Sequence, residues 1–302
     1  MKILLASSSH LGIDLLKHLQ NSEHQLLGAI SSPDQASGRG QSIGSNEFAA
    51  HCQRNDVVCY KPGSDQQLSE VLQQTQAELV ITLAYGRLIK ANELQMPKFG
   101  WLNVHFSLLP RWRGASPVQR AIAAGDRETG VTVFKLEEGL DTGPIYSTIS
   151  YPLDSKSRSD EVLTHLASLS IRPVNEALKM IENGQRPSAQ SGDGVTLAPK
   201  ILKSEGRIDW SKDSHEIEAR IRAFHPWPGA YTLIDGKRIG VIEGQVRDNK
   251  GAAGEIISLE PLIVASGSSA LEILRVKPEN KKEMSSSEWL RGARISLPCA
   301  FE

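Results

Sequence analysis

The chain has 302 residues and a mass of 33.0 kDa, which at roughly 150 residues per domain suggests two domains. Apolar residues make up 39% and charged residues 23% of it, which excludes disordered, collagen-like and disulfide-framework proteins. The 34 basic and 35 acidic residues nearly cancel, so the net charge of −1 excludes strong non-specific attraction to nucleic acid or to an anionic membrane. A polyanionic partner would have to bind at a local patch.

Neither the cysteines nor the hydropathy pattern indicates a secreted, metal-bound or membrane protein. The three cysteines form no CxxC pair and no zinc spacing, so we expect reduced thiols, a cytoplasmic protein and no structural metal. The apolar stretch over residues 1–6 is too short for a signal peptide, and no run approaches the ~18 apolar residues of a membrane helix. We therefore expect no membrane segment, and we expect a monomer.

Short apolar runs alternate with helical periodicity over about the first 150 residues, a pattern typical of crossover units on a largely parallel sheet. The predicted strands are 3–6, 26–30, 79–84, 101–105 and 131–136, and the predicted helices are around 15–19, 66–74 and 117–124. A further helical stretch runs from 160 to 181, where Pro173 should kink or divide it. This region predicts an α/β fold with an open, mostly parallel, doubly wound sheet.

The second half of the chain changes character after a stretch rich in Gly, Ser, Asp, Gln and Thr over residues 185–198, which indicates a linker. One helix is expected over 215–224, and the two prolines of the following His225–Gly229 segment end it. The strands expected after that are 231–234, 239–242, 255–259, 262–265 and 271–276. They predict a small antiparallel barrel. The predicted domains are 1–184 and 206–302, joined by a linker over 185–205.

The glycine-rich loop from Gly38 to Gly44 does not fit a dinucleotide-binding fingerprint. Its spacing is GxGxxxG, and it follows the second predicted strand, whereas the fingerprint needs glycines in the first strand-to-helix turn. Two interpretations stay open for it. The loop is either a flexible surface loop or one that presents Arg39 to a phosphate.

Polar side chains gather at the end of the strand predicted over 101–105. Asn103 and His105 are two residues apart, so both leave the same face, at the edge where open parallel sheets bind ligands. An Asn and a His that only satisfy local hydrogen bonds are the alternative. Asp141 favours a site, because it lies among glycines directly after another strand. A carboxylate facing His105 would raise the pKa of the ring and favour an imidazolium that stabilises an oxyanion.

The residues that follow His105 allow two further interpretations. A serine nucleophile at Ser107 is disfavoured, because the Gly-x-Ser-x-Gly motif is absent and Ser107 follows His105 by only two residues on the same segment. Arg111 and Arg113 flank Trp112. This pattern holds a polyanion by charge and stacking, or it is a solvated loop whose Trp packs into the domain.

Taken together, these segments are similar to those of the formyltransferases that use 10-formyltetrahydrofolate. The matching segments are Asn103–His105, Ser107–Gly114, Gly139–Gly143, Leu83–Gly86, Arg207–Trp210 and Ile221–Pro228, together with Gly38–Gly40. The resemblance covers nearly the full chain. It implies a Rossmann-like formyltransferase domain followed by a small OB-like β-barrel that helps to hold tRNA.

The resemblance also implies a reaction and a set of site residues. The implied reaction transfers the formyl group of 10-formyltetrahydrofolate to the free α-amino group of initiator methionyl-tRNA, without a metal. The implied catalytic residues are Asn103, His105 and Asp141; the implied folate-binding residues are Ser107, Leu108, Leu109 and Pro110; those for tRNA are Arg39, Arg111 and Arg113. Asn103 and a charged His105 would stabilise the tetrahedral oxyanion, while Asp141 holds His105 and helps to remove the amine proton.

Two departures from the family pattern and two alternative functions stay open. Gln41 and Ser42 stand where some relatives carry lysines, and Ser7–Ser9 replace a usual Gly-Thr-Pro turn. The same folate chemistry would serve an enzyme that formylates an amino sugar nucleotide or a small amine. A non-catalytic tRNA-binding module is the alternative from another class, and the joint presence of Asn103, His105 and Asp141 argues against it.

Overall fold

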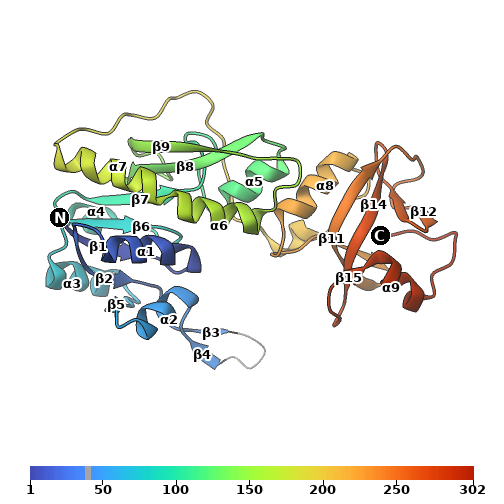
Figure 1. The fold of residues 1–302 in the computed structure, drawn as a ribbon, viewed down its shortest axis with the longest axis horizontal. Coiled ribbons are helices and arrows are strands. Elements are labelled where there is room, and N and C mark those ends of the chain that lie inside the picture. The colour runs from blue at the N-terminus through green and yellow to red at the C-terminus, as the bar shows by residue number, and fades with distance from the viewer. Residues whose placement is uncertain (38–41) are drawn as a thin grey trace. The chain divides into compact units, whose positions relative to one another are not determined.

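A computed structural model describes residues 1–37 and 42–302, and these residues form two compact units (Figure 1). The first unit comprises residues 1–117, 129–152 and 163–198. The second comprises residues 118–128, 153–162 and 199–302. Arg39, the central residue of the predicted phosphate loop, lies outside the described residues. On either side of it, β3 (Gln35–Ser37) and β4 (Ser42–Gly44) pair as a separate antiparallel ribbon.

The first unit is built on a seven-stranded sheet with the order β5-β2-β1-β6-β7-β8-β9. Its strands are β1 (Lys2–Ala6), β2 (Gln25–Ile30), β5 (Cys59–Tyr60), β6 (Leu79–Thr82), β7 (Trp101–His105), β8 (Glu128–Lys135) and β9 (Ile145–Pro152). The five strands from β5 to β7 are parallel, and β8 runs antiparallel to β7. The chain moves outward from β1 and then returns to β6 beside it, which creates a switch point at their carboxyl ends. The predicted Rossmann-like, mostly parallel sheet is confirmed.

Helices connect these strands. They are the 3₁₀ turn η1 (His10–Gly12), α1 (Ile13–Gln20), α2 (Glu47–Arg54), α3 (Asp65–Thr75), α4 (Ala91–Gln95), α5 (Pro117–Ala123), α6 (Ser159–Leu169) and α7 (Ile171–Glu182). Side-chain caps start two of them, because Asn46 accepts from the Ala49 amide and Ser64 accepts from the Gln67 amide. The division expected at Pro173 is confirmed: α6 ends one residue before Ser170, and Pro173 lies in the first turn of α7.

The apolar strand runs form the core of the first unit. All four residues of β6 are buried, as are Trp101 and Phe134, which are not exposed at all. The indole of Trp101 donates to the carbonyl oxygen of Glu93 at 2.8 Å, which satisfies the one polar group of this side chain. Burial of these strands fixes where their carboxyl ends, and therefore the loops that follow them, must lie.

Residues 185–198 have no helix and still belong to the first unit. Ile145 and Ser188 exchange two backbone hydrogen bonds, of 2.7 and 2.8 Å. Further along, the Arg113 amide donates to the Thr196 carbonyl, and the Ala198 amide donates to the Arg113 carbonyl. This stretch is therefore attached by its backbone to the β9 strand and to the loop after β7.

The second unit contains a curled antiparallel sheet. Its strands are β10 (Tyr231–Ile234), β11 (Lys237–Arg247), β14 (Ala270–Pro278), β13 (Leu262–Ala265) and β12 (Ile256–Leu259) in that order, with β15 (Met284–Ser285) beside β14. The helices are η2 (Lys203–Gly206), α8 (Ser214–Ala223) and α9 (Ser286–Ala293). Phe301 stacks with Trp210 and Trp289 in the core. The predicted fold class, a Rossmann-like domain followed by a small barrel-like antiparallel domain, is confirmed.

Among the described residues, no helix is at once long enough and apolar enough to cross a bilayer.

Candidate active site

The carboxyl end of β7 presents Asn103 beside the end of β6. Thr82 closes β6 and is the register partner of Asn103, and its hydroxyl donates to Asn103 Oδ1 at 2.9 Å. This contact orients the amide and leaves Nδ2 on the other side. Within the described part of the chain, Nδ2 donates to no acceptor. Asn103 therefore offers an unused N–H donor at the edge of the sheet, as an oxyanion requires.

Thr82 contacts the candidate site and was not predicted from the sequence. The signal was present, because Thr82 is the one polar residue that ends the otherwise apolar run of β6. Its importance depends on the pairing with Asn103, and that pairing follows only from the strand order.

His105 is buried, with a side chain only 5% exposed. Its Nε2 lies 2.9 Å from the carbonyl oxygen of Trp112, and the ring packs edge-on to Phe134. A carbonyl oxygen can only accept a hydrogen bond, so Nε2 carries the proton. In the neutral ring Nδ1 is then the unprotonated nitrogen.

Asp141 lies on the Nδ1 side of that ring. Its Oδ2 is 3.7 Å from His105 Nδ1, and it accepts a hydrogen bond of 2.7 Å from the amide of Gly114. The backbone of Asp141 has a φ of +50°, a left-handed conformation that is strained for a residue with a side chain. The structure thus brings His105 and Asp141 together, and a backbone donor holds the carboxylate.

The charge state of His105 differs from the expectation. From the sequence, Asp141 is expected to raise the pKa of the ring and to favour an imidazolium. In the structure, burial lowers the pKa of His105, and the opposing effects of Asp141 and the Trp112 carbonyl do not overcome it. Asp141 does raise the pKa of the ring, but the expected net rise is wrong, because the sequence does not reveal how completely the ring is removed from water. The lowered pKa favours the neutral imidazole at neutral pH.

The loop that follows β7 is held by hydrogen bonds at both ends. Ser107 is fully buried, and its hydroxyl donates to the Arg111 carbonyl at 2.6 Å. The Thr132 hydroxyl donates to the Ser107 carbonyl at 2.7 Å and accepts from the Leu109 amide at 3.2 Å. Since the Ser107 hydroxyl donates its proton to the Arg111 carbonyl and forms no hydrogen bond with His105 among the described residues, the geometry also disfavours a serine nucleophile.

Arg111 and Arg113 lie on either side of Trp112, but in different environments. The guanidinium of Arg111 stacks over the Trp112 ring, 4.6 Å from its centroid. Arg113 is half-buried, and its guanidinium donates to the side-chain oxygen of Gln190. The two arginines therefore point to separate partners.

The three serines that depart from the family pattern build the turn after β1. The Ser7 amide donates to the Ile30 carbonyl and the Ser8 amide to the Ala84 carbonyl, which ties the turn to its two neighbouring segments. The hydroxyl of Ser9 caps the 3₁₀ turn at the Leu11 amide. The serines thus satisfy local backbone groups.

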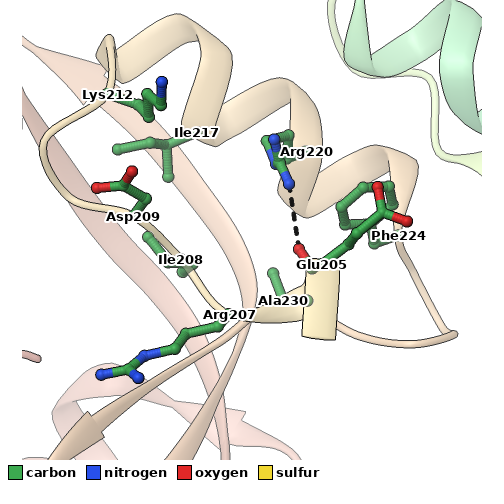
Figure 2. Close-up of a pocket in the computed structure, with 10 residues that line it drawn as sticks. Glu205, Arg207, Ile208, Asp209, Lys212, Ile217, Arg220, Phe224 and Ala230 are labelled. Carbon is green, nitrogen blue, oxygen red and sulfur yellow. Dashed lines mark hydrogen bonds between the residues drawn. The ribbon is translucent and has the colours of Figure 1, made fainter. Parts of the chain in front are cut away.

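A cavity of about 140 Å³ lies in the second unit (Figure 2). Its lining combines an apolar part, including Ile217 and Phe224, with charged residues such as Arg207 and Lys212. Figure 2 shows Arg220 directed at the backbone oxygen of Glu205, which lies 3.2 Å from the guanidinium. None of the site residues predicted from the sequence lines this cavity.

Among the described residues, one group of side chains has the composition of a metal site. The ligand atoms of Glu23, His24 and Glu182 lie within 4.8 Å of one another. His24 Nδ1 lies 3.4 Å from Glu182 Oε1, so these two residues form a direct histidine–carboxylate pair. None of the three is a predicted site residue.

Both halves of the chain match formyl transferases. The family described as "Formyl transferase" matches residues 1–175, and the family described as "Formyl transferase, C-terminal domain" matches residues 200–294. An N-formyltransferase structure from Helicobacter canadensis, in complex with folinic acid and dTDP-3-aminofucose, superposes with a TM-score of 0.68 at 18% identity. The superposition covers 90% of this chain and 99% of that one, and it shows the shared fold.

Curated relatives identify a narrower family within the formyl transferases. The chain is 37% identical to the methionyl-tRNA formyltransferase of Magnetococcus marinus, over 92% of this chain and 90% of that protein. It is 35% identical to the methionyl-tRNA formyltransferase of Jannaschia sp. over the full length of both. The chain therefore belongs to the methionyl-tRNA formyltransferase family.

Proposed function

We propose that this chain transfers the formyl group of 10-formyltetrahydrofolate to the free α-amino group of initiator methionyl-tRNA. The product is formylmethionyl-tRNA for translation initiation. The observation that carries the proposal is the arrangement of Asn103, His105 and Asp141 at the carboxyl edge of the sheet, in a chain similar over its full length to methionyl-tRNA formyltransferases. We propose that the chain acts as a monomer in the cytoplasm.

The three residues have complementary roles in this reaction. The amine nitrogen attacks the formyl carbon, and the electron pair of the carbonyl bond moves onto oxygen. Asn103 Nδ2, the unused donor, stabilises that oxyanion. Neutral His105 accepts the amine proton at Nδ1, and Asp141 stabilises the imidazolium that forms. The proton then passes to N10 of the folate as the carbon–N10 bond breaks.

Folate is proposed to bind along the loop of Ser107, Leu108, Leu109 and Pro110. This loop supports the proposal because hydrogen bonds of the Thr132 and Ser107 hydroxyls hold its backbone. It also leads directly from His105. A rigid loop beside the proton acceptor is suited to place N10 within reach of Nδ1.

The tRNA is proposed to contact Arg39, Arg111 and Arg113. Arg111 is exposed and stacks on Trp112, an arrangement that suits a phosphate or a base. Because the chain has a net charge of −1, tRNA binding depends on a few local contacts. The affinity for tRNA should fall as the salt concentration rises.

A formyltransferase acting on an amino sugar nucleotide is the second candidate. The superposed Helicobacter canadensis protein is in complex with such a nucleotide, dTDP-3-aminofucose, and has the same fold. The folate chemistry would be unchanged, so only the acceptor distinguishes the two functions.

The test is formyl transfer by the purified protein from 10-formyltetrahydrofolate to initiator methionyl-tRNA, in parallel with dTDP-amino sugars and with uncharged tRNA as a control. We expect formylmethionyl-tRNA, and no product with the sugars. Turnover of a sugar without formylation of the tRNA would replace the proposed function with the second candidate. Binding of tRNA without any formyl transfer would indicate a non-catalytic module.

A further inference from the structure

The side-chain amide of Gln190 uses every hydrogen-bonding group that it has. Its Oε1 accepts from Arg113 Nε at 3.1 Å and from Arg113 Nη2 at 2.7 Å. Its Nε2 donates to the carbonyl oxygens of Asp141 and Gly143, each at 2.8 Å. A primary amide has two N–H groups and two lone pairs, so no capacity is left over. One half-buried side chain therefore joins the loop after β7 to the loop after β8.

The backbone around Gln190 strengthens this connection. The Trp112 amide donates to the Thr196 hydroxyl at 2.8 Å, and the Arg113 amide donates to the Thr196 carbonyl at 2.9 Å. Gly114 has a φ of +128°, and a Cβ there would lie 2.5 Å from the Ala198 carbonyl oxygen. Only glycine permits this close approach. Residues 190–198 therefore lie against the loop that presents Arg113.

Asp141 is held from two sides. Its backbone carbonyl accepts from Gln190, and its carboxylate accepts from the Gly114 amide. Two residues further on, a Cβ on Gly143 would lie 1.8 Å from the Lys135 carbonyl oxygen, so the loop is packed tightly against β8. The left-handed backbone of Asp141 persists because these contacts determine it.

We propose that Gln190 is a positioning residue, which fixes Asp141 against His105 and holds Arg113 in the same framework. The inference rests on the proposed function, because the position of Asp141 affects turnover only if His105 exchanges a proton during the reaction. Gln190 acts through these neighbours and does not itself touch the reacting atoms.

The experiment compares Gln190→Ala, Gln190→Glu and the control Gln185→Ala. Gln185 is exposed, lies in the same segment, and its side chain makes no hydrogen bond with the described residues. Gln190→Ala should lower kcat on the order of 10-fold or more, because a misplaced catalytic group is costly, and should raise the KM for methionyl-tRNA by releasing Arg113. Gln190→Glu keeps an acceptor for Arg113, but it places a carboxylate oxygen where Nε2 donates to the carbonyl oxygens of Asp141 and Gly143. It should lower kcat and leave that KM unchanged, and Gln185→Ala should match the wild type.

A second measurement does not depend on turnover. The chain has 8 histidines, and NMR titration can follow His105 through the resonance that disappears in His105→Asn. The Asp141 carboxylate raises the pKa of His105. If Gln190→Ala displaces that carboxylate, the pKa of His105 should fall further, whereas a merely structural role elsewhere in the loop would leave it unchanged.

The two measurements separate the two proposals. An active wild type, with kcat and the pKa of His105 unchanged in both Gln190 variants, would overturn the positioning role and leave the proposed function standing. A wild type that formylates no tRNA, together with a lowered pKa of His105 in Gln190→Ala, would overturn the proposed function and leave the positioning of Asp141 standing. If Gln190→Ala does not fold, Gln190→Glu gives the same decision from its kcat and its titration.

Discussion

Each of the two units contains a histidine–aspartate pair with the same separation. His105 Nδ1 and Asp141 Oδ2 are 3.7 Å apart in the first unit, and His225 Nε2 and Asp160 Oδ2 are 3.7 Å apart in the second. Burial is the largest influence on both rings, and it lowers the pKa of each. Residue types and distance alone therefore do not distinguish the two pairs.

The surroundings of the two pairs do distinguish them. The Asp141 carboxylate is 11% exposed and bound by a backbone amide, whereas the Asp160 carboxylate is 38% exposed and also lies 3.5 Å from Arg158 Nε. Arg158 further lowers the pKa of His225, and it competes for the aspartate. In the first pair a backbone amide holds the carboxylate, and the pair lies at the carboxyl edge of the mostly parallel sheet.

The largest expected difference between the pairs is the effect of removing each histidine. His105→Ala should lower kcat for formyl transfer by on the order of 10²–10⁴-fold, because the proton acceptor is lost. His225→Ala should leave kcat within about twofold of the wild type, because the proposed chemistry does not use it. Steady-state kinetics with initiator methionyl-tRNA, alongside circular dichroism of both variants, checks this. Wild-type turnover in His105→Ala would remove His105 from the mechanism.

A smaller difference is expected for the two aspartates. Asp141→Asn preserves size and an acceptor for the Gly114 amide but removes the charge that stabilises the imidazolium, so kcat should fall on the order of 10–10²-fold. Asp160→Asn is the matched control and should leave kcat unchanged. Equal losses in both variants would show that the changes act on stability, and thermal unfolding of each variant would reveal that.

The smallest expected effect concerns stability as a function of pH. A histidine whose pKa is lowered on folding binds fewer protons in the native state than in the unfolded state. Its contribution to the free energy of unfolding is therefore complete above the unfolded pKa of about 6.5 and is lost as the pH falls below that value. The free energy of unfolding should therefore decrease between about pH 7 and pH 5. His105→Asn should flatten this dependence more than His225→Asn, because His105 is the more deeply buried ring. Urea titrations at several pH values measure both slopes, and a steeper slope in either variant would contradict the sign.

Local patterns predicted much of the fold. Continuous apolar runs correctly located β1 and β6, and an alternation of apolar and polar residues correctly located β7. Pro173 correctly predicted the break between α6 and α7. Strand β9 was not predicted, because its residues mostly alternate between half-buried and exposed and include Ser and Thr, so no apolar run marks it. Helix α2 was not predicted either; it has a side-chain cap but only three buried residues.

The residue types of the candidate site were predictable from the sequence, but the residues that hold them in position were not. Asn103, His105 and Asp141 could be selected because they are polar and end or follow apolar strands. Thr82 and Gln190 act on residues that are 21 and 49 positions away, so no local pattern indicates them. The predicted protonation state of His105 was wrong for a related reason. The carboxylate neighbour can be inferred from the sequence, but the burial that lowers the pKa results from the whole fold.

The place of Gln190 in the chain also bears on when the enzyme becomes competent during its synthesis. The proposed catalytic residues all precede residue 142, and the amide that holds their loops follows almost fifty positions later. Because a ribosome releases a chain from its N-terminus onward, a nascent chain with β1 to β9 already exposed still lacks this connection. The site therefore reaches its final geometry only after residues 190–198 have emerged and docked, which makes this segment the last part of the first unit to be completed.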